Sequence, residues 1–273
     1  MTAKKILFTL VLGVLLALQG IAQPGNDKSV AATKDNKATA TNTIKEVPFA
    51  VGEQLNYEVS WSSFVVAGEL TLETKARRTI DGVDAFHVSA QAQSVGIVSA
   101  VVYKVKDVYD SFLNARTLQP FRAEKNSRRG KKREQGTMIL DQQNGKAKLE
   151  DGKEVKIPQG TYDLASLLYA IRMIDLTPGK TQNFTLIEDG KLYELTITVE
   201  GREKIGTRMG DFNTVRVSTK AASTNRSGKD PYQLKIYLTN DAQRLPVLMT
   251  ASPAWGEVRV ELTSAMGTKK REK

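Results

Sequence analysis

The side chains of this 273-residue chain that could carry out chemistry begin with His87, its only histidine. A Ser-His-Asp hydrolase site would have to use it, yet no Gly-x-Ser-x-Gly turn occurs, and one histidine cannot build a multi-histidine metal site. Carboxylate pairs such as Asp107 with Asp110 lie in no calcium-loop pattern. We therefore predict no catalytic residue, no metal site and no cofactor, and keep a hydrolase that uses His87 as a distant alternative.

A run of basic residues is the second chemical feature. Between positions 125 and 133 the sequence reads KNSRRGKKR and contains no acid; the basic residues are Lys125, Arg128, Arg129, Lys131, Lys132 and Arg133. If residues 121–140 form a hairpin, the run lies near its tip, where it would attract anions such as phosphate-bearing lipids or an acidic envelope polymer. No aromatic residue interleaves with these cations, so nucleic acid is not an expected partner. The alternative is a solvated turn whose charge protects the sheet from aggregation.

Period-two alternation of apolar and polar residues predicts the elements that position these side chains. In EQLNYEVSW, residues 53–61, one face carries Leu55, Tyr57, Val59 and Trp61, as in a half-buried antiparallel strand. The pattern recurs in GELTLETKA, AFHVSAQAQ, KLYELTITVEG, NTVRVSTKA, YQLKIYLTN and GEVRVELTS, with glycine, asparagine and aspartate in the gaps. Many short strands with tight turns predict a mainly β protein with antiparallel sheets, arranged as a meander, half-barrel, barrel or sandwich.

One segment, at residues 163–175, has helical periodicity instead. Its apolar side chains recur at positions 164, 167, 168, 171 and 174. Thr161 or Asp163 can cap its first turn, and the Thr-Pro-Gly sequence at 177–179 ends it. We predict an amphipathic helix that covers one face or mouth of the sheet. Arg172 is its only cation, which favours a structural role over membrane binding.

The segments on the two sides of this helix resemble each other. Gly52 and Gly179 each precede an Asn-aromatic dipeptide at the same spacing, and each half then continues into a strand that contains Glu-Leu-Thr. The distance from Gly52 to Leu118 is 66 positions, and that from Gly179 to Leu245 is again 66. We predict that the fold is built from two duplicated meander halves. The alternative is that any two β-meanders share such features.

The N-terminus has the pattern of a secretory signal peptide. Two lysines precede an apolar run over residues 6–17, which is too short to span a bilayer comfortably. Small residues at Gly20 and Ala22 fit cleavage after Ala22. We therefore predict a signal peptide over residues 1–22, a periplasmic or secreted location, and no transmembrane span after its removal. The alternative is a retained N-terminal anchor.

Composition divides the remainder of the chain. Residues 23–46 are rich in Ala, Thr, Asn and Lys, which predicts a disordered linker. Residues 47–266 are expected to form a single β-rich domain, with halves at about 47–160 and 177–266 and the helix between them. Residues 267–273 are expected to form a basic tail. The sequence contains no cysteine, which excludes disulfides, thiolate metal sites and lipidation at the cleavage site.

Several of these residues together resemble the pattern of one family. They are Gly52-Glu53-x-Leu55-x-Tyr57 with Trp61 and Gly68, Leu118-x-Pro120, the basic turn at 128–133, and Tyr162-Asp163-x-x-Ser166-x-Leu168-Tyr169-x-x-Arg172 followed by Pro178-Gly179. Over nearly all of the folded region, the chain resembles the bacterial exported proteins grouped as domain of unknown function 3108. The resemblance implies an envelope location and a β-rich fold, and implies no reaction. Such folds are similar in outline to periplasmic lipoprotein-carrier half-barrels, in which a curved sheet and a helix enclose an apolar groove.

Two functional hypotheses remain open. In the first, a non-enzymatic periplasmic protein holds an apolar or anionic amphiphilic ligand, such as a lipid, in the groove of its sheet, while the basic run steers an anionic head group. The residues expected to line that groove are Tyr57, Trp61, Leu168, Ile171 and Arg172. In the second hypothesis, an envelope scaffold docks a partner protein through the basic hairpin and exposed strand edges. A ligand-sized cavity would favour the first hypothesis, and a filled core the second.

Overall fold

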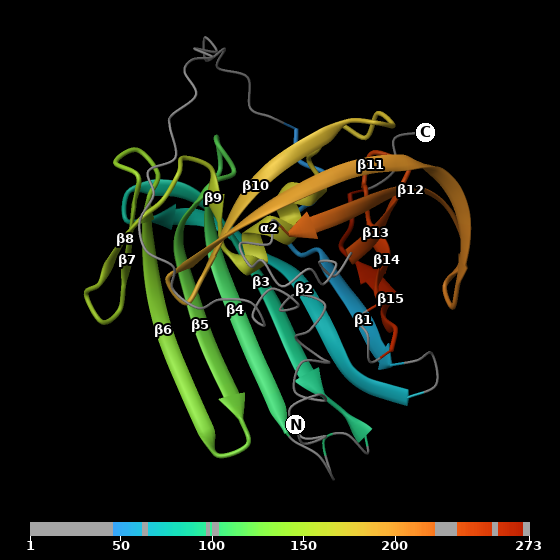
Figure 1. Ribbon diagram of the computed structural model, residues 1–273, viewed down its shortest axis with the longest axis horizontal. Coiled ribbons are helices and arrows are strands. Elements are labelled where there is room, and N and C mark those ends of the chain that lie inside the picture. The colour runs from blue at the N-terminus through green and yellow to red at the C-terminus, as the bar shows by residue number, and fades with distance from the viewer. Residues whose placement is uncertain are drawn as a thin grey trace, which may run out of the picture.

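The described residues form a single curved β-sheet with one short helix on its inner side (Figure 1). The computed structural model describes residues 46–61, 65–96, 99, 104–221, 234–252 and 256–269. The predicted signal peptide and all of the predicted linker except Glu46 lie outside the described residues. Within the described part, no helix is both long and apolar enough to cross a membrane.

The strands fall into two groups on either side of the helix. The first group consists of β1 (Gln54–Trp61), β2 (Val65–Ile80), β3 (Val83–Ser94), β4 (Val105–Asn114), β5 (Pro120–Arg129), β6 (Lys132–Asp141), β7 (Lys146–Leu149) and β8 (Glu154–Lys156). The short strand β9 (Thr161–Tyr162) and the helix α2 (Leu164–Ile171) follow. The second group consists of β10 (Thr181–Glu188), β11 (Lys191–Thr207), β12 (Gly210–Ala221), β13 (Leu234–Thr239), β14 (Pro246–Ala251) and β15 (Val258–Met266).

The strands form one 15-stranded sheet in the order β8-β7-β6-β5-β4-β3-β2-β1-β15-β14-β13-β12-β11-β10-β9. Each group is a meander whose neighbours pair antiparallel, and the pair β9 and β10 is parallel. The groups join where the first strand meets the last, because Val59 of β1 lies opposite Val260 of β15. The predicted mainly β, antiparallel fold is confirmed. The sheet stays open, with β8 and β9 at its two ends, and does not close into a barrel.

Matching hydrogen bonds at equivalent places confirm the two-half construction. Gly52 and Gly179 both adopt positive φ, 87° and 83°, at the turn that leads into β1 or β10. The amide of Gly52 donates to the carbonyl of Thr74 at 2.8 Å, and that of Gly179 donates to the carbonyl of Val199, also at 2.8 Å. A register shift follows each contact, in β2 after Thr74 and in β11 after Val199. Both turns need a residue that tolerates the left-handed region, which explains glycine at each.

The helix α2 is shorter than the predicted 163–175 and is buried on all sides. Asp163 caps it as predicted: its Oδ1 accepts from the amides of Ala165 and Ser166 at 2.9 and 3.1 Å. The helix ends at Ile171, where the amide of Arg172 bonds the carbonyl of Tyr169 and tightens the last turn. Its first residues, including Ala165 and Ser166 on the side expected to be polar, are buried. The helix therefore fills the interior of the curved sheet, as a helix apolar all round should.

Both halves contribute to one main core around this helix. Leu55, Tyr57 and Val59 of β1 are at most 1% exposed and pack in the same cluster as Leu167 of α2 and Ile197 of β11. These β1 residues are the face that alternation predicts to be buried. The core thus depends on strands from both meanders, so neither half has a complete core of its own.

Candidate functional site

A pocket of about 330 Å³ lies where the sheet fails to close. In the duplicated arrangement, β1 pairs with β15, but the equivalent pairing of β10 with β6 is missing. The pocket is lined from β4, β5 and β6, from the β7–β8 turn, from the start of α2 and from the β10–β11 turn. Its volume falls within the usual range of small-molecule sites.

The lining of this pocket has an apolar part and an acidic part. The apolar members are Ala123, Met138, Leu149 and Leu164, together with the ring of Tyr109. Carboxylates come from the two turns, as Glu150 and Asp151 from one and Glu188 and Asp189 from the other. Among the described lining residues, Lys125 is the only basic one. The site therefore combines an apolar floor with an acidic rim.

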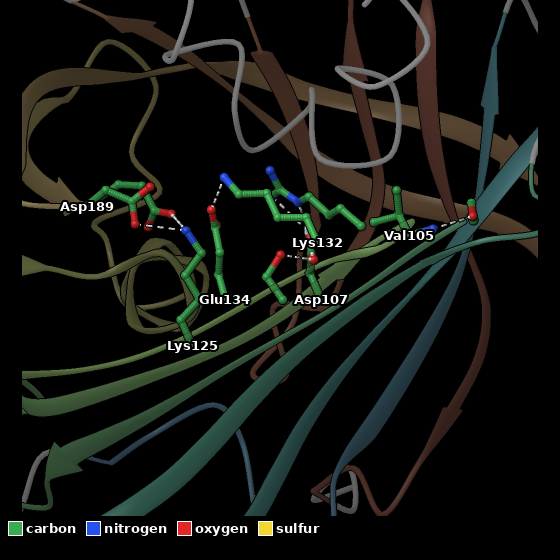
Figure 2. Close-up of polar contacts among 10 residues, drawn as sticks. Val105, Asp107, Lys125, Lys132, Glu134 and Asp189 are labelled. Carbon is green, nitrogen blue, oxygen red and sulfur yellow. Dashed lines mark hydrogen bonds and ion pairs between the residues drawn. The ribbon is translucent and has the colours of Figure 1, made fainter. Parts of the chain in front are cut away.

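Lys125 of β5 ties the first half to the β10–β11 turn. Its Nζ lies 3.1 Å from Oε1 of Glu188 and 2.8 Å from Oδ1 of Asp189 (Figure 2). Burial alone would lower the pKa of Lys125, but the two carboxylates outweigh it and raise that pKa. Burial raises the pKa of Glu188, which is 7% exposed, against the opposing effect of Lys125. Lys125 thus holds together the two sides of the open seam.

Tyr109 of β4 lines the pocket, and its hydroxyl group is buried without a hydrogen-bond partner among the described residues. Tyr109 lies opposite Lys125, and Lys125 lies opposite Gly136, so the three form one row across the inner face. Tyr109 is 6% exposed, and its hydroxyl has no hydrogen-bond partner among the described residues. Burial, followed by the charge of Glu188, raises the pKa of Tyr109 well above its usual value, so the hydroxyl stays protonated. A buried donor without a partner is costly unless something binds it.

Asp163 connects the pocket to the helix start. Its Oδ2 accepts from the hydroxyls of Ser111, at 2.6 Å, and Ser166, at 2.9 Å. Burial raises the pKa of Asp163, and these hydrogen bonds oppose that effect. Because the carboxylate is fully occupied as the helix cap, it positions Leu164 in the pocket lining and is not free for a ligand.

A second polar group lies on the same inner face, towards the tip of the β5–β6 hairpin. Asp107, which is 0% exposed, accepts a 2.5 Å hydrogen bond from Ser127 and pairs with Nη2 of Arg129 at 2.9 Å. Glu134 pairs with Lys132 beside it. Figure 2 shows Lys125, Glu134 and Asp107 rising from one side of the sheet. Lys125, Arg129 and Lys132 on this face therefore each have an acidic partner.

The residues expected to line the groove lie apart from this pocket. Tyr57, Leu168 and Ile171 belong to the packed core and are at most 7% exposed, and Trp61 packs against that core half-buried. Arg172 is 2% exposed and pairs with Glu53, whose Oε1 is 2.5 Å from its Nη1. These five residues thus lie in or around the helix α2, and none of them lines the 330 Å³ pocket.

The basic run divides between the two faces of its hairpin. A two-residue turn, Gly130-Lys131, joins β5 to β6 and places the run at the tip, as the sequence predicts. Lys125, Arg129 and Lys132 point inward and have acidic partners. Arg128 and Arg133 lie opposite each other on the outer face. Alternation along each strand causes this division, because neighbouring residues point to opposite faces.

His87 lies on the outer face of β3 in a satisfied polar cluster. Its Nε2 is 2.8 Å from Oδ1 of Asp110, and the same oxygen forms an ion pair with Nζ of Lys75 at 2.7 Å. The His87 ring stacks on that of Phe112, with 4.6 Å between the ring centroids. Among the described residues, the His87 ring makes no hydrogen bond to a serine hydroxyl, the contact that a Ser-His hydrolase site needs. No group of three potential metal ligands occurs in the described part of the chain.

Sequence reasoning missed the main residues of the pocket. The sequence around Glu188, Asp189 and Gly190 indicates only a turn, and no pattern in the sequence singles out Tyr109. Lys125 meets Glu188 across 63 positions. Only the fold brings them together, so no local pattern could have found this pocket.

Comparison with solved structures agrees with the fold. A beta-barrel-like protein of domain of unknown function DUF1849 from Brucella abortus matches with a TM-score of 0.57 and 14% identity, covering 79% of this chain and 97% of that chain. A DUF1089 family protein from Pseudomonas aeruginosa matches more loosely, with a TM-score of 0.38 and 13% identity over 63% of this chain and 85% of the other. The first likeness concerns the fold alone. No curated protein matches the sequence.

The family model described as "Protein of unknown function (DUF3108)" matches residues 56–263, which includes every strand of the main core from β2 to β14 and most of β1 and β15. The chain belongs to the DUF3108 family.

Proposed function

We propose that this protein is an exported, non-enzymatic envelope protein that binds an amphiphilic ligand in the pocket at the open seam. The observation that carries the proposal is the row of Tyr109, Lys125 and Gly136 beneath a 330 Å³ space, with the Tyr109 hydroxyl left without a partner. An apolar chain would pack on the floor, and a polar group near Tyr109 would accept its hydrogen bond. The signal-peptide pattern supports export.

The rim supports a neutral or cationic head group over an anionic one. Glu150, Asp151 and Asp189 are exposed carboxylates around the opening, and the ammonium of Lys125 already lies between Glu188 and Asp189. An anionic head group would meet like charge, whereas an amine would gain a favourable interaction. In this proposal the hairpin cations do not steer the ligand, because those inside the sheet are paired.

A pocket-filling variant tests the proposal. A Cβ on Gly136 would meet only Oε2 of Glu150, at 3.7 Å, so Gly136→Leu can enter the pocket without backbone strain. The matched control is Gly206→Leu in β11, where a Cβ meets Oδ1 of Asp211 at 3.5 Å; Gly206 does not line the 330 Å³ pocket. The assay is titration of the purified protein with the neutral fluorophore N-phenylnaphthylamine, followed by displacement with octylamine, octanol or octanoate.

We expect Gly136→Leu to weaken fluorophore binding by at least about tenfold, since overfilling a packed space costs roughly 1–3 kcal/mol. Gly206→Leu should bind as the unaltered protein does. Octylamine and octanol should displace the fluorophore at lower concentration than octanoate. Equal binding by the two leucine variants would refute the pocket, and preferential displacement by octanoate would refute the proposed head group.

A further inference from the structure

One row of side chains crosses the outer face of the sheet and changes from acidic to basic. Strand register places its members directly opposite one another on β15, β1, β2, β3, β4, β5 and β6; in that order they are Glu261, Glu58, Glu69, Gln93, Lys106, Arg128 and Arg133. The basic end includes Lys106, which is 19 positions before the basic run in the sequence. Charge along this row is therefore segregated by the fold.

Two of the three carboxylates at the acidic end of the row form ion pairs within the protein. Glu58 pairs with Arg208 at 2.6 Å, and Glu261 pairs with Arg259 at 2.9 Å. Glu69 accepts a 2.8 Å hydrogen bond from the amide of Gln93. The amide of Gln93 is neutral, so of these three carboxylates only Glu69 keeps a negative charge without a cationic partner among the described residues.

The basic end has no such compensation. Lys106, Arg128 and Arg133 are all exposed, and none has an acidic partner within the described part of the chain. Two more exposed lysines, Lys104 and Lys131, flank them at the same end, where the amide of Gly130 bonds the carbonyl of Lys104 at 2.8 Å. Like charges directly opposite on a sheet destabilise it. Protection of a free edge does not explain the row, because β4 and β5 have neighbours on both sides.

We propose that Lys106, Arg128 and Arg133 form a docking surface for an anionic lipid bilayer. The three side chains span two strand intervals, about 10 Å, and none of them lines the 330 Å³ pocket. Their exposure and spacing suit an array of phosphates on a surface, and no aromatic residue stands in the row to stack a nucleic-acid base. The surface is independent of the proposed ligand pocket, which opens to the inner face.

Vesicle co-sedimentation of the purified full protein tests this surface. The test variant is Lys106→Gln, Arg128→Gln and Arg133→Gln combined. The control combines Arg78→Gln, Lys180→Gln and Arg202→Gln, which removes the same charge from exposed residues without ion pairs elsewhere on the described surface. Both variants keep the basic C-terminal residues. Vesicles contain phosphatidylglycerol in phosphatidylcholine, or phosphatidylcholine alone, over a salt series.

We expect the unaltered protein to bind phosphatidylglycerol vesicles and to lose binding as salt rises. The test variant should bind roughly a hundredfold more weakly, because each basic side chain near an anionic surface contributes about fivefold. The control should lose much less, and the test variant should melt no lower than the unaltered protein, since it relieves like-charge contacts. Equal losses in the two variants, salt-independent binding, or binding to phosphatidylcholine alone would overturn the proposal. Salt-sensitive binding to a purified acidic protein but not to either vesicle would also overturn it.

Discussion

Replacing Arg172 with methionine is expected to destabilise the fold by about 3–5 kcal/mol. The guanidinium pairs with Glu53 through contacts of 2.5 and 3.1 Å, and its Nη2 also donates to the carbonyls of Pro48, at 2.8 Å, and Gln243, at 2.9 Å. The variant leaves Glu53, which is 0% exposed, as a buried carboxylate without its partner. Breaking a buried pair in this way typically costs about 3–5 kcal/mol, since the remaining charge is desolvated without compensation.

Urea unfolding followed by circular dichroism measures this loss. With a slope of about 3 kcal/mol/M, the midpoint should fall by about 1–2 M. The double variant Glu53→Leu with Arg172→Met removes both charges, so it should be less destabilised than Arg172→Met alone by about 2 kcal/mol, the remaining cost coming from the two unsatisfied carbonyls. Arg77→Met, which breaks the exposed pair with Asp84, should leave the urea midpoint nearly unchanged and serves as the control. The reasoning would be refuted if the double variant lost as much stability as the single variants Glu53→Leu and Arg172→Met together. It would also be refuted if Arg172→Met lost no more stability than the control Arg77→Met.

Three further predictions concern the outer face, the pocket and the N-terminus. Burial opposes ionisation of Asp110, but hydrogen bonds from His87 and Lys75 lower its pKa to about 2. Asp110→Asn should therefore reduce the free energy of unfolding by an amount on the order of 1 kcal/mol at neutral pH. The unaltered protein should lose this stabilisation as the pH falls from about 4 to 2, which urea unfolding across that range measures. Tyr109→Phe should raise the melting temperature of the empty protein and weaken ligand binding, whereas Tyr57→Phe, which also removes an unpartnered buried hydroxyl, should raise it without changing binding. Mass spectrometry of the exported protein should give an N-terminus at Gln23; an intact first segment would contradict the signal-peptide prediction.

Local patterns predict most of the fold. Alternation in residues 53–61 assigns Leu55, Tyr57 and Val59 to the buried face, and the structure confirms it. Equal spacing of Gly52 and Gly179 from later landmarks predicts the duplicated meanders, which matching turns confirm. These patterns predict the structure correctly because each depends on contacts between strands that are neighbours in the sequence, whose register is set by the hydrophobic pattern and the turn between them.

The candidate site depends on contacts that no local pattern reports. The salt bridge of Lys125 with Glu188 joins two meanders, and the missing pairing between β6 and β10 creates the space around it. The basic run could have been divided between two faces from strand alternation alone, since Arg128 and Arg129 must point to opposite sides of β5. That Lys106 lies beside Arg128 of the basic run could be known only from the register of β4 against β5. The strand order of the sheet, and the register of strands whose pairing no sequence pattern indicates, such as β4 with β5, therefore could not be predicted from the sequence.

The pairing of β1 with β15 also sets an order of assembly. Asn56 and Ser264, whose side chains bond at 2.8 Å, are 208 positions apart, so the centre of the sheet cannot form until the last strand has been synthesised. Closing such a loop costs roughly 2 kcal/mol more than closing one of about twenty residues. Each meander can form early from short-range hairpins, while the central strand β1 waits with one side unpaired. The rate-limiting step of folding is thus expected at the middle of the sheet, and a chain truncated before Val258 would expose the edge of β1 to pairing with other chains.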